Sequence, residues 1–290
     1  MLSPIYAASA DQAYTVQLVK ADELRTSNPK QSRVLLNNID ETQLKNNEKE
    51  LYQYLTALNL FVNGNVLKAK ISLRSLLENS QDVHIRIRTL GTLLSLYATS
   101  NDWLNALQTV NFLNNYLETE ISPKKIKIDK IKFDILNFYN NIGEYHLAKK
   151  LAIELLKANP SQRFNCLASV ELLNSKIKTV VKSIGFKDFE DTAKLCLALN
   201  DPITAQVINV YLAEYQLALN SPKKAVELLE SNISDVKATQ YQALIAGFYD
   251  LLAQSYLALK NYPEAERYAQ ALLDTKELHQ YQPAITTAYK

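Results

Sequence analysis

One twelve-residue pattern recurs along the chain and limits what the chain can fold into. Residues 95–106, 137–148 and 254–265 each carry an aromatic residue, a short polar stretch with Gly or Asn, a second aromatic residue and then Ala. Looser copies occupy 58–69 and 214–225. Neighbouring copies lie roughly 40 residues apart, a period typical of helical-repeat proteins. The pattern therefore predicts a solenoid in which each unit buries its apolar face against the next.

One unit is hidden in the largest gap between copies. The interval from Ala148 to Ala225 is about twice the repeat period, so we place a further unit at 161–201, with Ala193 as its weakest anchor. The complete set of alanine anchors is Ala69, Ala106, Ala148, Ala193, Ala225 and Ala265.

Each unit is predicted to be two antiparallel helices joined by a tight turn. A tyrosine on the first helix should face the alanine on the second, because the helices approach closely only at a small side chain. Gly or Asn in the turn suits a positive φ. An aromatic residue at the start of the second helix is expected to fill the gap between the helices. The tyrosines of the first helices are Tyr97, Tyr139 and Tyr256, and the alanines opposite them are Ala106, Ala148 and Ala265. The turn residues are Gly64, Asn101 and Gly143, and the aromatic residues that start the second helices are Trp103, Tyr145 and Tyr262.

The composition and the N-terminal region fit an all-α chain. The 290 residues include only five glycines and eight prolines, while 47% are hydrophobic. Residues 17–40 are typical of two short helices with a break at 27–29, where Asn28 can cap the second helix and Pro29 can occupy its first position. We expect capping helices over 11–45 and about six degenerate hairpins over 46–290, the last of them incomplete.

The best-matched unit resembles the tetratricopeptide repeat. Within 129–160 the family's positions are held by Tyr139, Gly143, Tyr145, Ala148 and Pro160. The unit departs from the family at Ala152, where an aromatic residue is more usual. The resemblance implies a right-handed superhelix of antiparallel helix pairs, with a concave surface that binds a peptide, a protein or a small ligand.

A narrower resemblance covers nearly the whole chain. Residues 21–39, and the unit 161–202 with its Arg163-to-Cys166 start and Cys196-to-Pro202 linker, are similar to the extracytoplasmic repeat region of certain bacterial diguanylate cyclases. Proteins of that group carry a signal sequence, such repeats, one transmembrane helix and a cytoplasmic GGDEF domain. No GGDEF motif occurs in this sequence. The resemblance implies the sensing part of a longer protein, and we expect the chain to be a fragment.

The N-terminal residues bear on the compartment. Ala8-Ser9-Ala10 before Asp11 resembles a signal-peptidase site, which would make 1–10 the remnant of a signal peptide. The alternative is an ordinary disordered N-terminus. We expect a periplasmic location, with a cytoplasmic one as the alternative.

Several function classes find no support in the sequence. A net charge of +2 without a basic stripe argues against nucleic acid, and no run of about 18 apolar residues is present to span a membrane. No phosphate loop, nucleophile motif or metal-ligand spacing occurs, so we expect no enzyme activity, no metal and no cofactor. Cys166 and Cys196 are expected as two small buried side chains, while a disulfide between them stays open.

The candidate binding residues lie one turn away from the packing positions on the first helices, where the concave surface should be. Asparagine amides there offer both donors and acceptors to a peptide backbone or a carboxylate. The candidates are Phe133, Asn137, Asn140 and Asn141, then Ser95 and Thr99, then Asp250 and Gln254, and Glu214.

Two functional hypotheses follow. The first is a non-catalytic sensor module, the periplasmic part of a membrane-bound diguanylate cyclase, whose ligand would bias one of two states. The alternative is a cytoplasmic scaffold for protein–protein interaction. A homodimer is compatible with either hypothesis.

Overall fold

The computed structural model describes residues 10–119 and 125–275, and all regular structure in these ranges is helical. Fourteen α-helices pair into seven antiparallel hairpins within the described ranges. Their bounds are α1 Ala10–Ser27, α2 Pro29–Asn37, α3 Asn46–Val62, α4 Val66–Asn79, α5 Val83–Thr99, α6 Trp103–Thr119, α7 Lys125–Asn141, α8 Tyr145–Lys157, α9 Gln162–Val180, α10 Phe186–Cys196, α11 Pro202–Ala218, α12 Pro222–Thr239, α13 Gln242–Ala258 and α14 Tyr262–Leu273. Three 3₁₀ turns lie at Glu41–Gln43, Val181–Ser183 and Leu197–Leu199.

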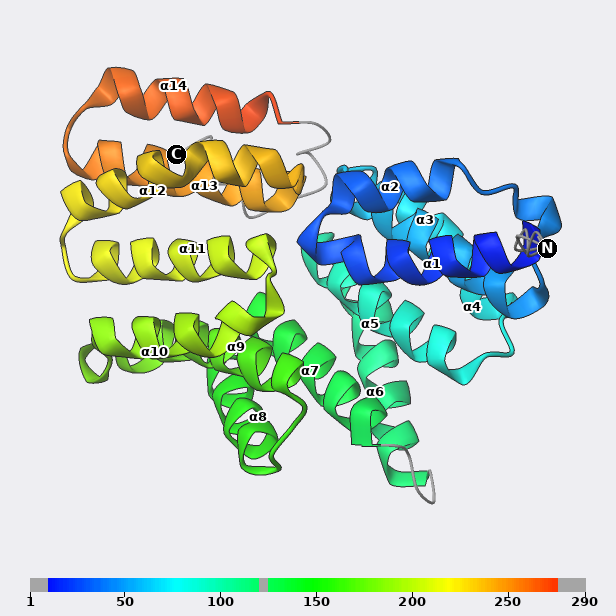
Figure 1. The fold of residues 1–290 in the computed structure, drawn as a ribbon. Coiled ribbons are helices and arrows are strands. Elements are labelled where there is room, and N and C mark those ends of the chain that lie inside the picture. Colours follow the sequence, from blue (N-terminus) through cyan, green and yellow to red (C-terminus); the bar gives the residue numbers. More distant parts are fainter. Residues whose placement is uncertain (1–9, 120–124, 276–290) are drawn as a thin grey trace, which may run out of the picture.

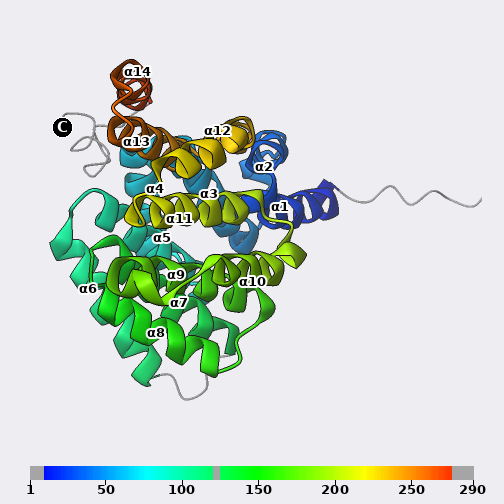
Figure 2. The ribbon, with the colours of Figure 1, turned by 90° about the vertical axis from the view of Figure 1, so that its left-hand side faces the viewer.

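The hairpins stack side by side into a right-handed superhelical solenoid, which confirms the predicted fold class. The first helix of each hairpin contacts the first helix of the next, from α1 through α3, α5, α7, α9 and α11 to α13. Figure 1 shows the hairpins following one another along a curved path, and Figure 2 shows α6 and α8 on the outside. The odd-numbered helices therefore form the inner layer. The expected incomplete last hairpin would fall in 276–290, outside the described residues.

The turns inside the hairpins have the predicted geometry. Gly64, Asn101 and Gly143 have φ values of 86°, 54° and 84°. In each case the next residue donates its backbone N–H to a carbonyl five residues earlier, as in Glu144 to Tyr139 at 2.9 Å. This closing bond satisfies a carbonyl at the helix end that has no partner within the helix.

The alanine anchors pack as expected in four of the hairpins. Ala69, Ala106, Ala148 and Ala225 are fully buried, whereas Ala193 and Ala265 are half-buried. α14 is the last helix that the structure describes, and its outer side has no described neighbour.

The expected role of the second aromatic residue is wrong for Trp103 and Tyr262. Trp103 is 44% exposed and Tyr262 is 61% exposed, while Tyr145 is half-buried. These residues occupy the first position of their helices, and helical side chains lean toward the N-terminus. The rings therefore lean toward the turn and away from the gap between the two helices. Packing instead uses the tyrosines of the first helices, such as Tyr97 at 5% exposure.

The predicted break in the N-terminal hairpin is confirmed. α1 ends at Ser27, Pro29 begins α2, and the side chain of Asn28 accepts a hydrogen bond from the backbone N–H of Gln31 at 3.0 Å. The cap satisfies one of the free N–H groups at the start of α2.

The N-terminal hairpin also contacts the C-terminal half of the chain. Arg33 on α2 donates to the side chains of Asn63 and Gln240, both at 2.6 Å. The rings of Phe61 and Tyr241 meet edge to face with centroids 6.2 Å apart. α1 also contacts α11, and the two helices lie close together in Figure 2. These contacts bring the two ends of the superhelix together around its inner face.

Cys166 and Cys196 are both buried, as expected, and the disulfide that the sequence left open is formed. Cys166 on α9 and Cys196 at the end of α10 form a disulfide with their Cα atoms 5.0 Å apart. The two helices are antiparallel, so residues 30 apart in sequence face each other across one hairpin. The bond joins the two helices of the unit whose alanine anchor is the weakest.

None of the helices in the described ranges is both long and apolar enough to cross a lipid bilayer.

Candidate functional site

A cavity of about 470 Å³ lies on the inner face, between helices that are far apart in the sequence. All of its walls come from the inner layer: α1, α3, α5, α7 and α9. The apolar side chains in its lining are Leu58, Phe61, Ile87, Phe133, Phe164 and Leu167. The lining also carries cationic side chains, from Arg25, Arg88, Lys130 and Arg163. Its size and mixed lining are those of ligand sites in proteins.

Two of the arginines share one carboxylate. Arg88 donates to both oxygens of Asp22, at 2.9 and 2.5 Å, and Arg25 donates to Oδ1 of Asp22 at 2.9 Å. Burial alone would raise the pKa of Asp22, but the hydrogen bond and charge of Arg88, with those of Arg25, hold the pKa below its usual value. The Arg88 guanidinium also lies over the Tyr54 ring, 4.4 Å from its centroid. Asp22 is thus ionised and fixes both arginines in place.

Lys130 is neutralised within its own helix. Its ammonium group pairs with the carboxylate of Asp134 one turn later on α7. Burial raises the pKa of Asp134, and the charge of Lys130 offsets part of that effect. The pair leaves no net charge from α7 in the cavity.

Arg163 is the cation without a partner. Its guanidinium lines the cavity and makes no hydrogen bond or ion pair with any described residue. Burial lowers its pKa, and the positive charges of Arg25 and Arg88 lower it further. The charge that most favours its ionised form is Asp201, whose carboxylate already accepts the backbone N–H groups of Ile203 and Thr204 at the start of α11. The cavity therefore holds a surplus of positive charge centred on Arg163.

Three of the predicted binding residues line this cavity. They are Ser95 on α5, and Phe133 and Asn137 on α7. Ser95 and Asn137 occupy equivalent positions in successive hairpins, as do Arg88 and Lys130. The repeat register thus places one layer of side chains on the inner face.

Asn140 does not face the cavity, contrary to its expected place. It is only 4% exposed, and its amide donates to the backbone oxygen and the carboxylate of Glu171 on α9, at 2.9 and 2.8 Å. Its oxygen accepts from Ser175 at 2.8 Å. Asn140 lies one turn on from Asn137, on the side of α7 that packs against α9. It joins the two helices and is not free to contact a ligand.

The other candidates lie away from the cavity. Thr99 donates to backbone oxygens of its own helix, and Glu214 pairs with Lys178 at 2.8 Å. Gln254 donates to Asp250 at 3.0 Å on α13. Asn141 is exposed and donates to Asn137 at 3.3 Å. None of these residues is among those that line the cavity.

The cationic residues are the ones that sequence reasoning missed. Arg25, Arg88, Lys130 and Arg163 are spaced irregularly in the sequence and converge only when the first five hairpins stack. The register that relates Arg88 to Lys130 was one available signal. The unpaired state of Arg163 had no signal in the sequence, because it depends on where the other side chains lie.

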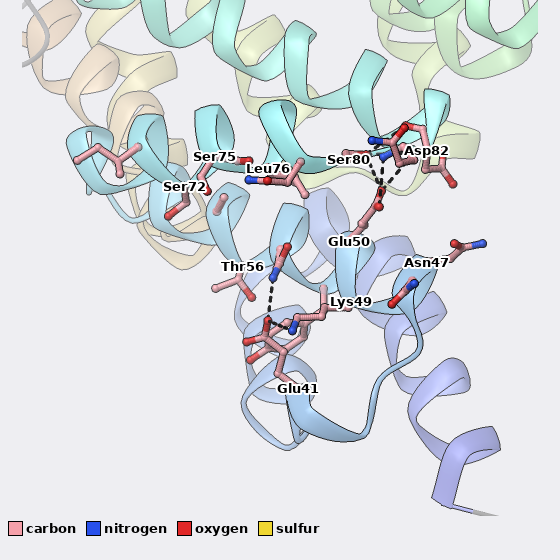
Figure 3. Close-up of a pocket in the computed structure, with 17 residues that line it drawn as sticks. Glu41, Asn47, Lys49, Glu50, Thr56, Ser72, Ser75, Leu76, Ser80 and Asp82 are labelled. Atoms are coloured by element: carbon pink, nitrogen blue, oxygen red, sulfur yellow. Dashed lines mark hydrogen bonds and ion pairs between the residues drawn. The ribbon is translucent and has the colours of Figure 1, made fainter.

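A second hollow, of about 1,050 Å³, lies between α3 and α4 and is shown in Figure 3. Its charged groups are satisfied internally. Glu50 accepts from the side chain of Ser80 at 2.5 Å and from the backbone of Asp82 at 3.4 Å, and Glu41 accepts from Gln53 at 2.8 Å. It is larger than the inner cavity, but it offers no unpaired ion to a ligand, so the inner cavity is the better candidate.

Metal binding finds no support in the part of the chain that the structure describes. No group of three or more His, Cys, Asp and Glu side chains lies close enough together there to hold an ion.

Comparisons with known proteins show the fold. No protein-family model matches the sequence, and no curated protein matches it either. A crystal structure of a Rap protein complexed with competence and sporulation factor superposes with a TM-score of 0.66 at 10% identity, over 96% of this chain and 80% of that one. A tetratricopeptide repeat protein from Parabacteroides merdae superposes with a TM-score of 0.50 at 14% identity, over 96% and 100%. Together with the hairpin geometry, these likenesses show that the chain has the fold of a tetratricopeptide-type helical-repeat solenoid.

Proposed function

We propose that this chain is a non-catalytic recognition module that binds a peptide or a protein segment on its inner face. The observation that carries the proposal is the inner cavity, which is walled by five first helices and holds a cation with no partner of its own. The Rap structure was solved in complex with a bound factor, which supports a binding role for this fold. An unpaired buried charge costs stability, so a protein keeps one most readily where a ligand completes it.

A displayed library of random peptides, selected on the immobilised protein, tests the proposal. The affinity of the selected peptides is then measured for the wild type and for Ser95→Ala/Asn137→Ala. Both side chains line the cavity without holding the fold together, so we expect affinity to fall by about tenfold, equivalent to about 1.4 kcal/mol. Gln254→Ala, on the exposed side of α13, is the control and should leave affinity unchanged. Failure to select any peptide, or peptides insensitive to the double substitution, would count against the inner face.

Our finer proposal is that the module is the periplasmic sensing part of a membrane-bound diguanylate cyclase. The Cys166–Cys196 disulfide supports export, because disulfides persist in oxidising compartments and are rare in the cytosol. The support for the cyclase is the sequence resemblance over 21–39 and 161–202 alone. The alternative is a cytoplasmic scaffold with the same inner face.

The redox state of the two thiols in the source cells separates these compartments. Cells are quenched with acid, and free thiols are alkylated with a maleimide reagent that adds visible mass. Export predicts that the two cysteines react with the maleimide only after the disulfide has been reduced. A chain that is fully alkylated before reduction would favour the cytoplasmic scaffold.

A further inference from the structure

We propose that the inner cavity binds the carboxylate of a ligand that also carries an apolar body, with the carboxylate on Arg163 and the body along the aromatic wall. The inference deepens the proposed function, on which it rests for the choice of the inner face as the ligand face. It specifies the chemical class of ligand that the inner face would bind.

The balance of charge in the cavity requires an anion. Three guanidinium groups, from Arg25, Arg88 and Arg163, face one carboxylate, that of Asp22. Lys130 and Asp134 cancel each other. Among the cavity-lining groups and their bonded partners, two positive charges are therefore left over in a part-buried site, and Asp201 outside the lining favours the charge of Arg163 without bonding to it. An anionic ligand would supply the negative charge that the cavity lacks.

The donors are of the kind that suits a carboxylate. A guanidinium presents a planar fork that matches the two oxygens of a carboxylate. Asp22 holds Arg25 and Arg88, so these two groups are preorganised beside Arg163 and lose little freedom on binding. The side chain of Asn137 adds an amide on the same cavity wall.

Much of the remaining lining is apolar. The rings of Phe133 and Phe164 pack with centroids 5.9 Å apart, and Leu58 and Ile87 complete the wall. An aliphatic or aromatic group would lose contact with water there, at about 25 cal/mol for each Å² that is covered. A simple inorganic anion would satisfy the charge and leave this wall bare. The site therefore favours an organic acid over inorganic phosphate.

Calorimetry with 4-phenylbutyrate tests the inference, with 4-phenylbutyramide and inorganic phosphate as comparison ligands. We expect the acid to bind and the amide not to bind, and we expect phosphate to bind more weakly than the acid. Arg163→Gln should weaken binding of the acid by about tenfold or more. Arg74→Gln, which removes the same charge from the exposed side of α4, should leave binding unchanged. Equal binding of acid and amide, tighter binding of phosphate, or an unaffected Arg163→Gln variant would each overturn the inference, as would no binding of the acid at millimolar concentration.

The source of the carboxylate is resolved with the peptide Ala-Ala-Phe, as the free acid and as the C-terminal amide. Binding of the free-acid peptide alone would show that a peptide terminus fits the site. Binding of 4-phenylbutyrate without either peptide would uphold the carboxylate site and contradict the proposed peptide-binding function. Selected library peptides that bind equally to wild type and Arg163→Gln would uphold the function and contradict this inference.

Because Arg163 has no protein partner, its loss should not harm the fold. Arg163→Gln should raise the melting temperature of the ligand-free protein or leave it unchanged, and should reduce the rise in melting temperature that 4-phenylbutyrate gives the wild type. A lowered melting temperature in the absence of ligand would mean that Arg163 is structural, and would contradict the inference.

Discussion

Gly91 on α5 lies directly against the carboxylate of Asp134 on α7. A Cβ atom at position 91 would fall 2.0 Å from Oδ2 and 2.5 Å from Cγ of Asp134. The Nζ of Lys130, paired with that carboxylate, would lie only 2.7 Å from the same Cβ. The glycine is therefore what lets the Lys130–Asp134 pair sit between the two helices, at the wall of the cavity.

Gly91→Ala should destabilise the protein. Overpacking in a tight interface costs about 1–3 kcal/mol, and the higher helix propensity of Ala returns about 1 kcal/mol of it. We therefore expect a net loss of up to about 2 kcal/mol in the free energy of urea unfolding. Gly247→Ala is the matched control, because nothing lies within 4 Å of a Cβ there. That variant should gain about 0.5–1 kcal/mol. Equal changes in stability for Gly91→Ala and Gly247→Ala would contradict the close approach of Gly91 to Asp134.

Asn137 and Asn140 should behave oppositely, although they are one turn apart on α7. Asn140→Ala removes the amide bonded to buried Glu171, and leaving such a group without its partner costs about 1–3 kcal/mol of stability. Asn137→Ala should change stability by less than about 0.5 kcal/mol, as surface substitutions do, and should weaken ligand binding instead. Urea unfolding and peptide affinity, measured on both variants, separate the two roles. Reversed effects would mean that the asparagines are assigned to the wrong faces.

Glu171 should make stability depend on pH in a way that a glutamine cannot. Burial raises the pKa of Glu171 above its usual 4.5, although hydrogen bonds from Asn140 and Tyr211 lower it in part. The folded state thus holds this proton more tightly than the unfolded state. Its contribution to stability is fully present below pH 4.5 and is lost as the pH rises through the raised pKa.

The measurement compares the free energies of urea unfolding of the wild type and Glu171→Gln from acidic to neutral pH. In the difference between the two proteins, the contributions of the other carboxylates cancel. We expect the stability of the wild type relative to the variant to fall as the pH rises above about 4.5. A constant difference would show that the pKa of Glu171 is the same in the folded and unfolded states.

Reduction of the Cys166–Cys196 bond should cost stability without abolishing the fold. A loop of this length predicts a loss of about 2–4 kcal/mol, which unfolding with and without a reductant measures. The variant Cys166→Ala/Cys196→Ala should be insensitive to the reductant. If the reductant lowers the free energy of unfolding equally in the wild type and in the double variant, the effect does not come from this bond.

The parts of the fold that could be predicted from the sequence are those encoded locally. Asn28 and Pro29 carry their own capping chemistry, and Gly64 and Asn101 adopt a positive φ without help from distant residues. The repeat register extends such local information along the chain. It also placed Ser95 and Asn137 on the inner helices.

The rest depends on how the hairpins meet. The burial of Asn140, for example, follows from the position of α9, which packs against α7. Arg163 and Arg25 line one cavity only because the stacking of five hairpins brings α1 and α9 together. No pattern within a single unit contains that information.

Hydrogen exchange on the complex with the tightest selected peptide tests the central claim most directly, since it reports which helices a ligand protects. The account predicts that added protection falls on the inner helices that form the cavity, α1, α3, α5, α7 and α9, and not on the outer helices α4 and α6. Protection confined to the hollow between α3 and α4, or to the outer layer, would contradict the inner cavity as the recognition site.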